Sequence, residues 1–247
     1  MTRPWDEQNK RNWFNEQTRK RSYGDDVLKR LNALEKKFRI QKYGALSIDP
    51  KRYPLYLILG EPFDPLKKTI LITGGVHGYE TSGVHGAIAF MEFKSSEYVR
   101  KFNLICAPCI SPWAYETVNR WNPNAVDPNR SFFLGSPAEE SALFLAAISP
   151  YLQTLHAHFD LHETTDTDET VFRPALERRD GIVQAPSSIP DGFYTVGDAG
   201  KPQIEFQDAI IASVKKVTHI ASGDGSGKII GSDLVSEGVI LYSLKNL

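Results

Sequence analysis

The stretch TILITGGVHGYETSGVHGA, residues 69–87, decides the fold class. Residues 69–73 are apolar and β-branched and run into two glycines, a pattern typical of a buried strand that ends in a turn. Residues 82–92 contain alanine, methionine and isoleucine and predict a helix, and residues 103–106 predict the next strand. The order strand, helix, strand predicts an α/β sheet covered by helices.

The flanking segments predict further elements around the same sheet. Apolar residues at steps of three and four predict an amphipathic helix over residues 25–42. Short apolar segments bounded by Asp, Pro or Gly predict strands at 43–48 and 53–60. We also expect helices at 138–155 and 203–217, strands at 158–162 and 238–242, and long loops at 111–137 and 164–200. With no repeat or linker in the sequence, we expect one domain over residues 1–247, in which residues 1–50 form a helical and strand extension.

Charge and hydropathy exclude several classes of partner. The chain of 247 residues has 29 basic and 30 acidic side chains and a net charge of −1, which predicts no nucleic-acid partner. The first residues have no apolar core of a signal peptide, and no run of eighteen apolar residues occurs, so we expect no membrane span and a cytoplasmic location. Cys106 and Cys109 form a single C-x-x-C, too little for a structural zinc site, and buried thiols are favoured over a redox dithiol.

Three residues at the ends of predicted strands have the chemistry of metal ligands. His77 and Glu80 lie three residues apart on the loop that leaves the strand at 69–73, and open α/β sheets place their sites on such loops. Imidazole and carboxylate together suit Zn²⁺. His162 closes the strand predicted at 158–162 and supplies a third ligand. Taken alone, the first two are more typical of a solvated pair near the start of a helix.

The neighbours of His162 have separate expected roles. Asp160 alternates to the same face of the strand as His162, so it is either a hydrogen-bond acceptor beneath that imidazole or a loop-anchoring carboxylate. Glu163 points the other way on an extended strand and is expected to be a surface residue or loop anchor. His158 shares the face of His162 but lies at the opposite end of the strand.

Three polar residues of the long loop are candidates for substrate binding: Arg120, Asn129 and Arg130. A guanidinium near a metal can hold a carboxylate through two hydrogen bonds and can stabilise an oxyanion, and an asparagine adds a neutral donor. Without the other segments, these would be read as surface residues.

Taken together and in this order, the three segments resemble the zinc carboxypeptidase superfamily, which includes the succinylglutamate desuccinylase and aspartoacylase group. The matching residues are His77-Gly78-Tyr79-Glu80, Arg120-Trp121-Asn122 with residues 125–132, and Asp160-Leu161-His162. The resemblance spans residues 69–165. It implies a three-layer α/β/α fold around a mixed, mostly parallel twisted sheet.

The resemblance also implies roles for individual residues. His77, Glu80 and His162 would hold zinc. Arg130 with Asn129 would hold the free carboxylate of the substrate, and Arg120 would polarise the scissile carbonyl.

Three features depart from the family pattern. Ala125 stands where the family has glycine, and Pro128 where it has an apolar residue. The family also has a glutamate late in a C-terminal strand that acts as the general base, whereas the last acidic residue here is Glu237, just before the final predicted strand. Glu205 is a weaker candidate. We therefore leave the base unassigned and expect the C-terminal end of the domain to be incomplete.

The sequence predicts a zinc metallopeptidase, a hydrolase that cleaves an amide bond next to a free carboxylate in a small peptide. One alternative is a deacylase of N-acyl amino acids with the same ligands. Another is a catalytically silent module that binds metal and carboxylates.

Overall fold

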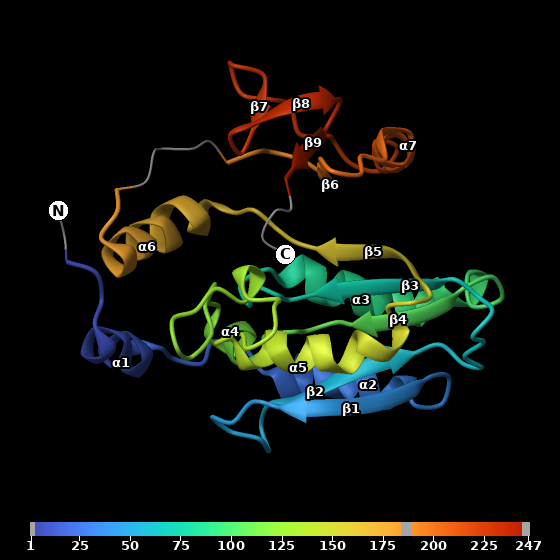
Figure 1. Cartoon of the computed structure of the whole chain (residues 1–247), viewed down its shortest axis with the longest axis horizontal. Coiled ribbons are helices and arrows are strands. Elements are labelled where there is room, and N and C mark those ends of the chain that lie inside the picture. Colours follow the sequence, from blue (N-terminus) through green and yellow to red (C-terminus); the bar gives the residue numbers. More distant parts are fainter. Residues whose placement is uncertain (1–2, 184–188, 244–247) are drawn as a thin grey trace. The chain divides into compact units, whose positions relative to one another are not determined.

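The computed structural model describes residues 3–183 and 189–243 (Figure 1). These residues form two compact units. The main unit is Asp6–Glu163, and the C-terminal unit contains the described residues from Thr164 onward together with those before Asp6. The single domain over residues 1–247 stays a prediction.

A mixed five-stranded sheet forms the centre of the main unit. Its strands are β1 (Arg39–Ala45), β2 (Pro54–Leu59), β3 (Thr69–Gly74), β4 (Asn103–Ala107) and β5 (Leu155–Leu161), in the order β1-β2-β4-β3-β5. β3 pairs in parallel with β4 and β5, whereas β2 is antiparallel to β1 and β4. Four of the five strands therefore point the same way, so the sheet is mostly parallel, as the sequence resemblance implied.

Helices cover both faces of this sheet. The main unit contains α1 (Glu7–Glu16), α2 (Lys29–Leu34), α3 (Thr81–Phe93), α4 (Pro112–Thr117) and α5 (Glu139–Ile148). Side chains of β4 alternate between two cores: Leu104 and Cys106 pack with α2 and α3, while Ile105 packs with Phe144 and Ile148 of α5. The three-layer α/β/α arrangement is thereby confirmed, and α5 and α3 lie on opposite sides of the strands in Figure 1.

The C-terminal unit has a small sheet of its own. It contains α6 (Arg173–Asp180), β6 (Thr195–Asp198), α7 (Ile204–Val214), β7 (Lys228–Ile229), β8 (Ser232–Ser236) and β9 (Val239–Tyr242). The strand order is β6-β9-β8-β7. β6 and β9 are parallel, and Ile240 of β9 is fully buried beside Ala221 and Ile229.

The helix predicted over 25–42 is wrong in its C-terminal part. A π-helical turn and α2 cover residues 24–34, and β1 begins at Arg39. The strand predicted at 43–48 accordingly runs over Arg39–Ala45. Ile40 pairs with Ile58 of β2 in the sheet. Phe38 alone continues the helical spacing, and strand pairing stabilises this segment more than one further helical contact would.

The helix predicted over 138–155 is also too long. Pro150 has no N–H to continue the helix, so α5 ends at Ile148 and a 3₁₀ turn, Ser149–Tyr151, follows. β5 then begins at Leu155, three residues before the predicted strand. The remaining predicted helices and strands agree with the structure to within three residues, and residues 244–247 lie outside the described ranges.

Both predicted long loops contain regular structure. The first, at 111–137, holds α4 and the 3₁₀ turn Pro128–Arg130, and the second, at 164–200, holds α6 and β6. Cys106 and Cys109 are buried free thiols, as predicted, and burial raises the pKa of both. Among the described residues, no helix has the length and apolar character to cross a membrane.

Candidate metal centre

The loop between β3 and α3 carries two of the predicted ligands, His77 and Glu80, both almost fully buried. Its course is fixed by close packing against α4. A Cβ atom at Gly78 would overlap the backbone of Ala114 and Tyr115, so only glycine fits between the two predicted ligands. The chain therefore turns tightly and points both side chains toward one another.

His162 follows the last residue of β5 and reaches the same place. β3 and β5 are parallel neighbours with Gly74 opposite Leu161, so both chains leave the sheet at the same edge. The start of α3 packs closely against the end of β5. The approach is so close that a Cβ at Gly83 would overlap the carbonyl oxygen of Leu161. This contact brings His162 beside Glu80.

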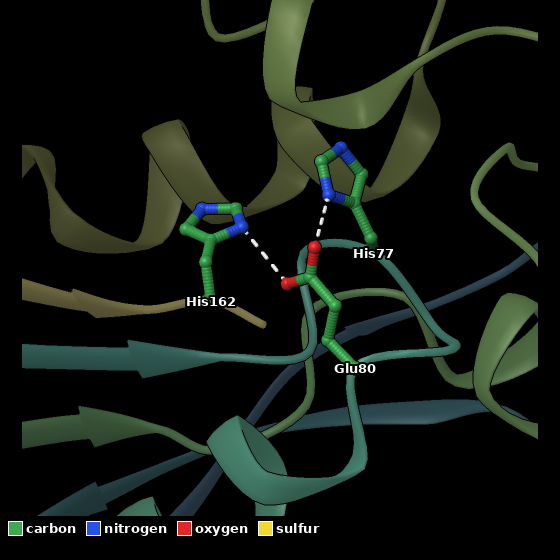
Figure 2. Close-up of side chains that lie close together, drawn as sticks. All are labelled: His77, Glu80 and His162. Carbon is green, nitrogen blue, oxygen red and sulfur yellow. Dashed lines mark hydrogen bonds and ion pairs between the residues drawn. The ribbon is translucent and has the colours of Figure 1, made fainter. Parts of the chain in front are cut away.

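The three side chains converge on one point (Figure 2). The Nδ1 atom of His77 lies 2.7 Å from Oε1 of Glu80, and Nδ1 of His162 lies 2.8 Å from Oε2 of the same carboxylate. Each residue offers one ligand atom within 4.8 Å of the other two. Neighbouring ligand atoms of tetrahedral zinc are roughly 3.3 Å apart for bond lengths of about 2.0 to 2.1 Å. The group therefore needs only small shifts to accept such an ion.

Glu80 shows that the set suits a cation. Its Oε2 atom is buried, and no donor among the described residues meets it with hydrogen-bond geometry, although His162 is close. A buried carboxylate oxygen needs a positive partner, either a charged imidazole such as His162 at 2.8 Å or a bound cation. Two imidazoles and one carboxylate are the ligands of catalytic zinc sites, which keep a further coordination position open. The donor chemistry thus fits zinc.

A second carboxylate lies behind each imidazole. Nε2 of His77 is 3.0 Å from Oδ1 of Asp127, and Nε2 of His162 is 2.7 Å from Oδ2 of Asp160. In a neutral imidazole, a carboxylate that accepts from Nε2–H leaves the lone pair on Nδ1, where it can bind a metal ion, whereas without a metal Nδ1–H donates to Glu80. Metal-bound histidines typically have such a partner. Asp160 is therefore the acceptor beneath His162, one of its two predicted roles.

The charges of the group are strongly coupled. Burial raises the pKa of Asp127 and of Asp160, but the hydrogen bonds and charges of His77 and His162 outweigh it and hold both well below their usual range. Burial lowers the pKa of His162, but Asp160 and Glu80 raise it well above its usual value. Three carboxylates around two imidazoles therefore attract positive charge, as protons or as a cation.

The predicted substrate-binding residues all lie on the loop that carries Asp127. Nε of Arg120 donates to Oδ2 of Asp127 at 3.2 Å, and Nη1 lies 3.4 Å from the hydroxyl of Tyr79. Asn129 donates its backbone N–H to Oδ1 of Asp127 at 2.9 Å. Arg130 is exposed at the end of the 3₁₀ turn, and its charge helps to lower the pKa of Asp127. One carboxylate thus links this loop to His77.

Two residues of the centre received no role from the sequence. Asp127 stands fifty positions from His77, and only the fold shows that they meet. Tyr79 stacks on His77, with ring centroids 6.0 Å apart and planes 14° apart. Glu163 accepts from the backbone and hydroxyl of Ser82 at 3.0 and 2.9 Å, so it is a loop anchor as predicted.

The two candidate bases named from the sequence belong to the C-terminal unit. Glu237 is exposed and ion-paired with Lys215 at 2.6 Å. Glu205 lies in the first turn of α7 and is exposed. In the main unit, Glu80, Asp127, Asp160 and Glu163 are all engaged as described above. The general base stays unassigned.

Comparison with known proteins identifies the fold. No protein-family model and no curated protein matches the sequence. A solved structure from Shewanella denitrificans, provisionally described as a metallopeptidase, is 17% identical, with a TM-score of 0.66 over 90% of this chain and 73% of its own. A similarly described protein from Shewanella amazonensis is 19% identical, with a TM-score of 0.65 over 94% and 83%.

A metallo-carboxypeptidase from Burkholderia cenocepacia is 16% identical, with a TM-score of 0.52 over 86% of this chain and 50% of its own. The chain therefore has the metallocarboxypeptidase-like fold that the sequence resemblance implied.

Proposed function

We propose that this chain is a zinc-dependent hydrolase that cleaves an amide bond next to a free carboxylate, of the metallocarboxypeptidase type. The observation that carries the proposal is the convergence of His77, Glu80 and His162 at the edge of the sheet, with a carboxylate behind each imidazole. The fold shared with metallopeptidases supports it. When bound by these three residues, zinc supplies a polarising charge for the amide carbonyl and for a water molecule.

The residues of the chain would each have a limited task. Asp127 and Asp160 keep the imidazoles in one tautomer and one orientation. Arg120, half-buried and fixed by Asp127, would direct its charge to the carbonyl oxygen of the scissile bond. Arg130 is exposed beside this group and would hold the substrate's terminal carboxylate, with Asn129 as a neutral donor.

A substrate panel tests the proposal. The zinc-loaded protein is incubated with short peptides that have a free C-terminus, with the same peptides amidated at the C-terminus, and with N-acyl amino acids. We expect cleavage of the free peptides alone. We also expect Arg130→Ala to raise KM with little change in kcat, because a carboxylate contact made in both ground and transition state affects binding. Arg100→Ala, an exposed arginine elsewhere in the main unit, is the matched control.

Other outcomes would contradict the proposal in different ways. Cleavage of N-acyl amino acids alone would assign the chain as a deacylase. Binding of carboxylates without hydrolysis of any substrate would assign it as a silent module. Cleavage of amidated and free peptides at equal rates would refute the role of the free carboxylate.

A further inference from the structure

Residues 6–23, here called the N-terminal segment, precede every motif of the metal centre and have no role in the proposed chemistry. The segment begins with α1, whose start is fixed by reciprocal hydrogen bonds between Asp6 and Asn9. It continues without regular secondary structure to Tyr23, which is buried in the core of the main unit. Its contacts reach both loops of the metal centre.

Arg21 contacts the loop that carries the first two ligands. Its Nη2 atom donates to the carbonyl oxygen of Tyr79 at 3.1 Å, and Tyr79 lies between His77 and Glu80 in the chain. The guanidinium also lies over the ring of Tyr115, 4.9 Å from its centroid. Arg21 therefore holds the peptide that joins the two ligand residues.

The placement of Arg21 is costly for stability. Its Nη1 atom is buried, and no hydrogen-bond acceptor for it occurs within residues 3–183 and 189–243. A buried donor without an acceptor costs about 1 to 3 kcal/mol. Such a cost favours a role for this side chain other than stabilising the fold.

Gln17 and Trp13 contact the second loop, on either side of Arg120. Oε1 of Gln17 accepts from the side chain of Asn119 at 2.8 Å, and the carbonyl of Asn119 accepts from the backbone N–H of Tyr79 at 3.1 Å. The ring of Trp13 packs against that of Trp121, with centroids 5.6 Å apart. The residues before and after Arg120 are thus both held by the N-terminal segment.

The segment itself is anchored at the end of α4. The backbone N–H groups of Lys20 and Arg21 donate to the carbonyl of Glu116, and the N–H of Tyr23 donates to its carboxylate at 2.9 Å. Glu116 is fully buried and also binds Arg52. A charge-assisted and buried anchor of this kind gives the segment one position relative to the sheet.

We propose that the N-terminal segment is a positioning element that fixes the metal-binding loop against the loop of Arg120, with Arg21 and Gln17 as its positioning residues. The proposal rests on the proposed zinc site. Loss of the Arg21 contact removes a charged donor from the Tyr79 carbonyl, which keeps only its weaker hydrogen bond from Thr81 among the contacts described, and so loosens the peptide between His77 and Glu80 before metal binds. Loss of the Gln17 contact removes the acceptor of the Asn119 side-chain amide and loosens the chain next to Arg120.

Metal binding in the absence of substrate tests the proposal. The dissociation constant for Zn²⁺ is measured by competition with a chromophoric chelator, and the visible spectrum is recorded with Co²⁺ in place of zinc. We expect Arg21→Ala to weaken Zn²⁺ binding about tenfold and to change the Co²⁺ spectrum, since loss of a residue that orients metal ligands typically costs 10- to 100-fold in affinity. Arg21→Lys retains a donor for the Tyr79 carbonyl and should restore most of the affinity.

Gln17→Ala should leave Zn²⁺ affinity within about twofold and instead lower kcat through Arg120. Arg19→Ala, an exposed arginine of the same segment, is the matched control and should leave affinity and kcat unchanged.

The outcomes separate this inference from the proposed function. If Arg21→Ala only lowers the unfolding temperature of the metal-free protein, with Zn²⁺ affinity and Co²⁺ spectrum unchanged, the residue is structural and the inference is refuted. In that case the zinc site still stands. If the unaltered protein binds no Zn²⁺, both proposals fail together.

Discussion

Replacing Asp160 by asparagine removes one negative charge from the group behind the proposed zinc ligands and keeps the size of the side chain. In the folded protein, Oδ2 of Asp160 is 2.7 Å from Nε2 of His162, and Oδ1 accepts from the hydroxyl of Thr73 at 2.6 Å. The same hydroxyl lies 2.7 Å from Nε2 of His158. Because Thr73 has one proton and gives it to Asp160, His158 must donate to Thr73.

An asparagine cannot satisfy both neighbours. If its oxygen faces His162, its NH₂ group faces Thr73, and the threonine proton loses its acceptor. If its NH₂ group faces His162, the imidazole must move its proton to Nδ1, the atom that would bind zinc. In the better arrangement a charge-assisted hydrogen bond becomes a neutral one, a loss of about 1.4 kcal/mol. This corresponds to about tenfold weaker zinc binding.

The assay is competition for Zn²⁺ with a chromophoric chelator at pH 7, on the unaltered protein and on Asp160→Asn. Asp233→Asn, an exposed aspartate of the C-terminal unit, is the matched control and should leave the dissociation constant unchanged. Equal zinc affinity of Asp160→Asn and the unaltered protein would refute the reasoning, because the carboxylate would then not orient His162.

Three further changes have expected results. Thr73→Val removes the donor to Asp160 and should weaken Zn²⁺ binding threefold to tenfold in the same competition assay; unchanged affinity would contradict the hydrogen-bond chain. Burial raises the pKa of Glu140 from 4.5 to about 7, so the folded state holds this proton more tightly and loses stability as pH rises between these values.

In urea unfolding of the metal-free protein, Glu140→Gln should therefore stabilise by up to about 3 kcal/mol at pH 8 and by little at pH 4, whereas an equal effect at both would contradict the shift. Gly78→Ala should lower the stability of the folded protein by at least about 3 kcal/mol, because its Cβ would overlap α4. The control Gly86→Ala, whose Cβ would be 3.9 Å from Leu161, should be neutral or slightly stabilising in thermal unfolding. Similar effects of the two substitutions would be inconsistent with the packing.

The sequence predicts the central strands and the proposed metal ligands because both depend on short local patterns. Residues 69–73 are continuous and apolar and form β3 as expected. His77 and Glu80 are three residues apart and are followed by a helix, so their pairing follows from a local pattern, although packing of Gly78 against α4 fixes the turn between them. His162 is predicted as a third ligand from its position at the end of a strand. Parallel pairing of β3 with β5 brings it to the same edge of the sheet.

The misplaced boundaries depend on contacts that no local pattern contains. The helical spacing of Phe38 continues that of Leu34, and only the pairing of Ile40 with β2 shows that a strand has begun. Asp127 meets His77 across fifty residues, and Arg21 meets Tyr79 across 58. Hydrogen bonds of this kind depend on the folded chain, so the roles of Asp127 and Arg21 cannot be predicted until the loops are placed.

The most direct test of the proposed zinc centre is the metal content of the purified protein, measured by mass spectrometry after dialysis against metal-free buffer. We predict about one zinc per chain in the unaltered protein and in the control Arg19→Ala, and almost none in His77→Ala or His162→Ala, since each variant removes one of three ligands. Absence of zinc from the unaltered protein, even after incubation with Zn²⁺, would contradict the account. So would equal zinc content in His77→Ala, His162→Ala and the unaltered protein.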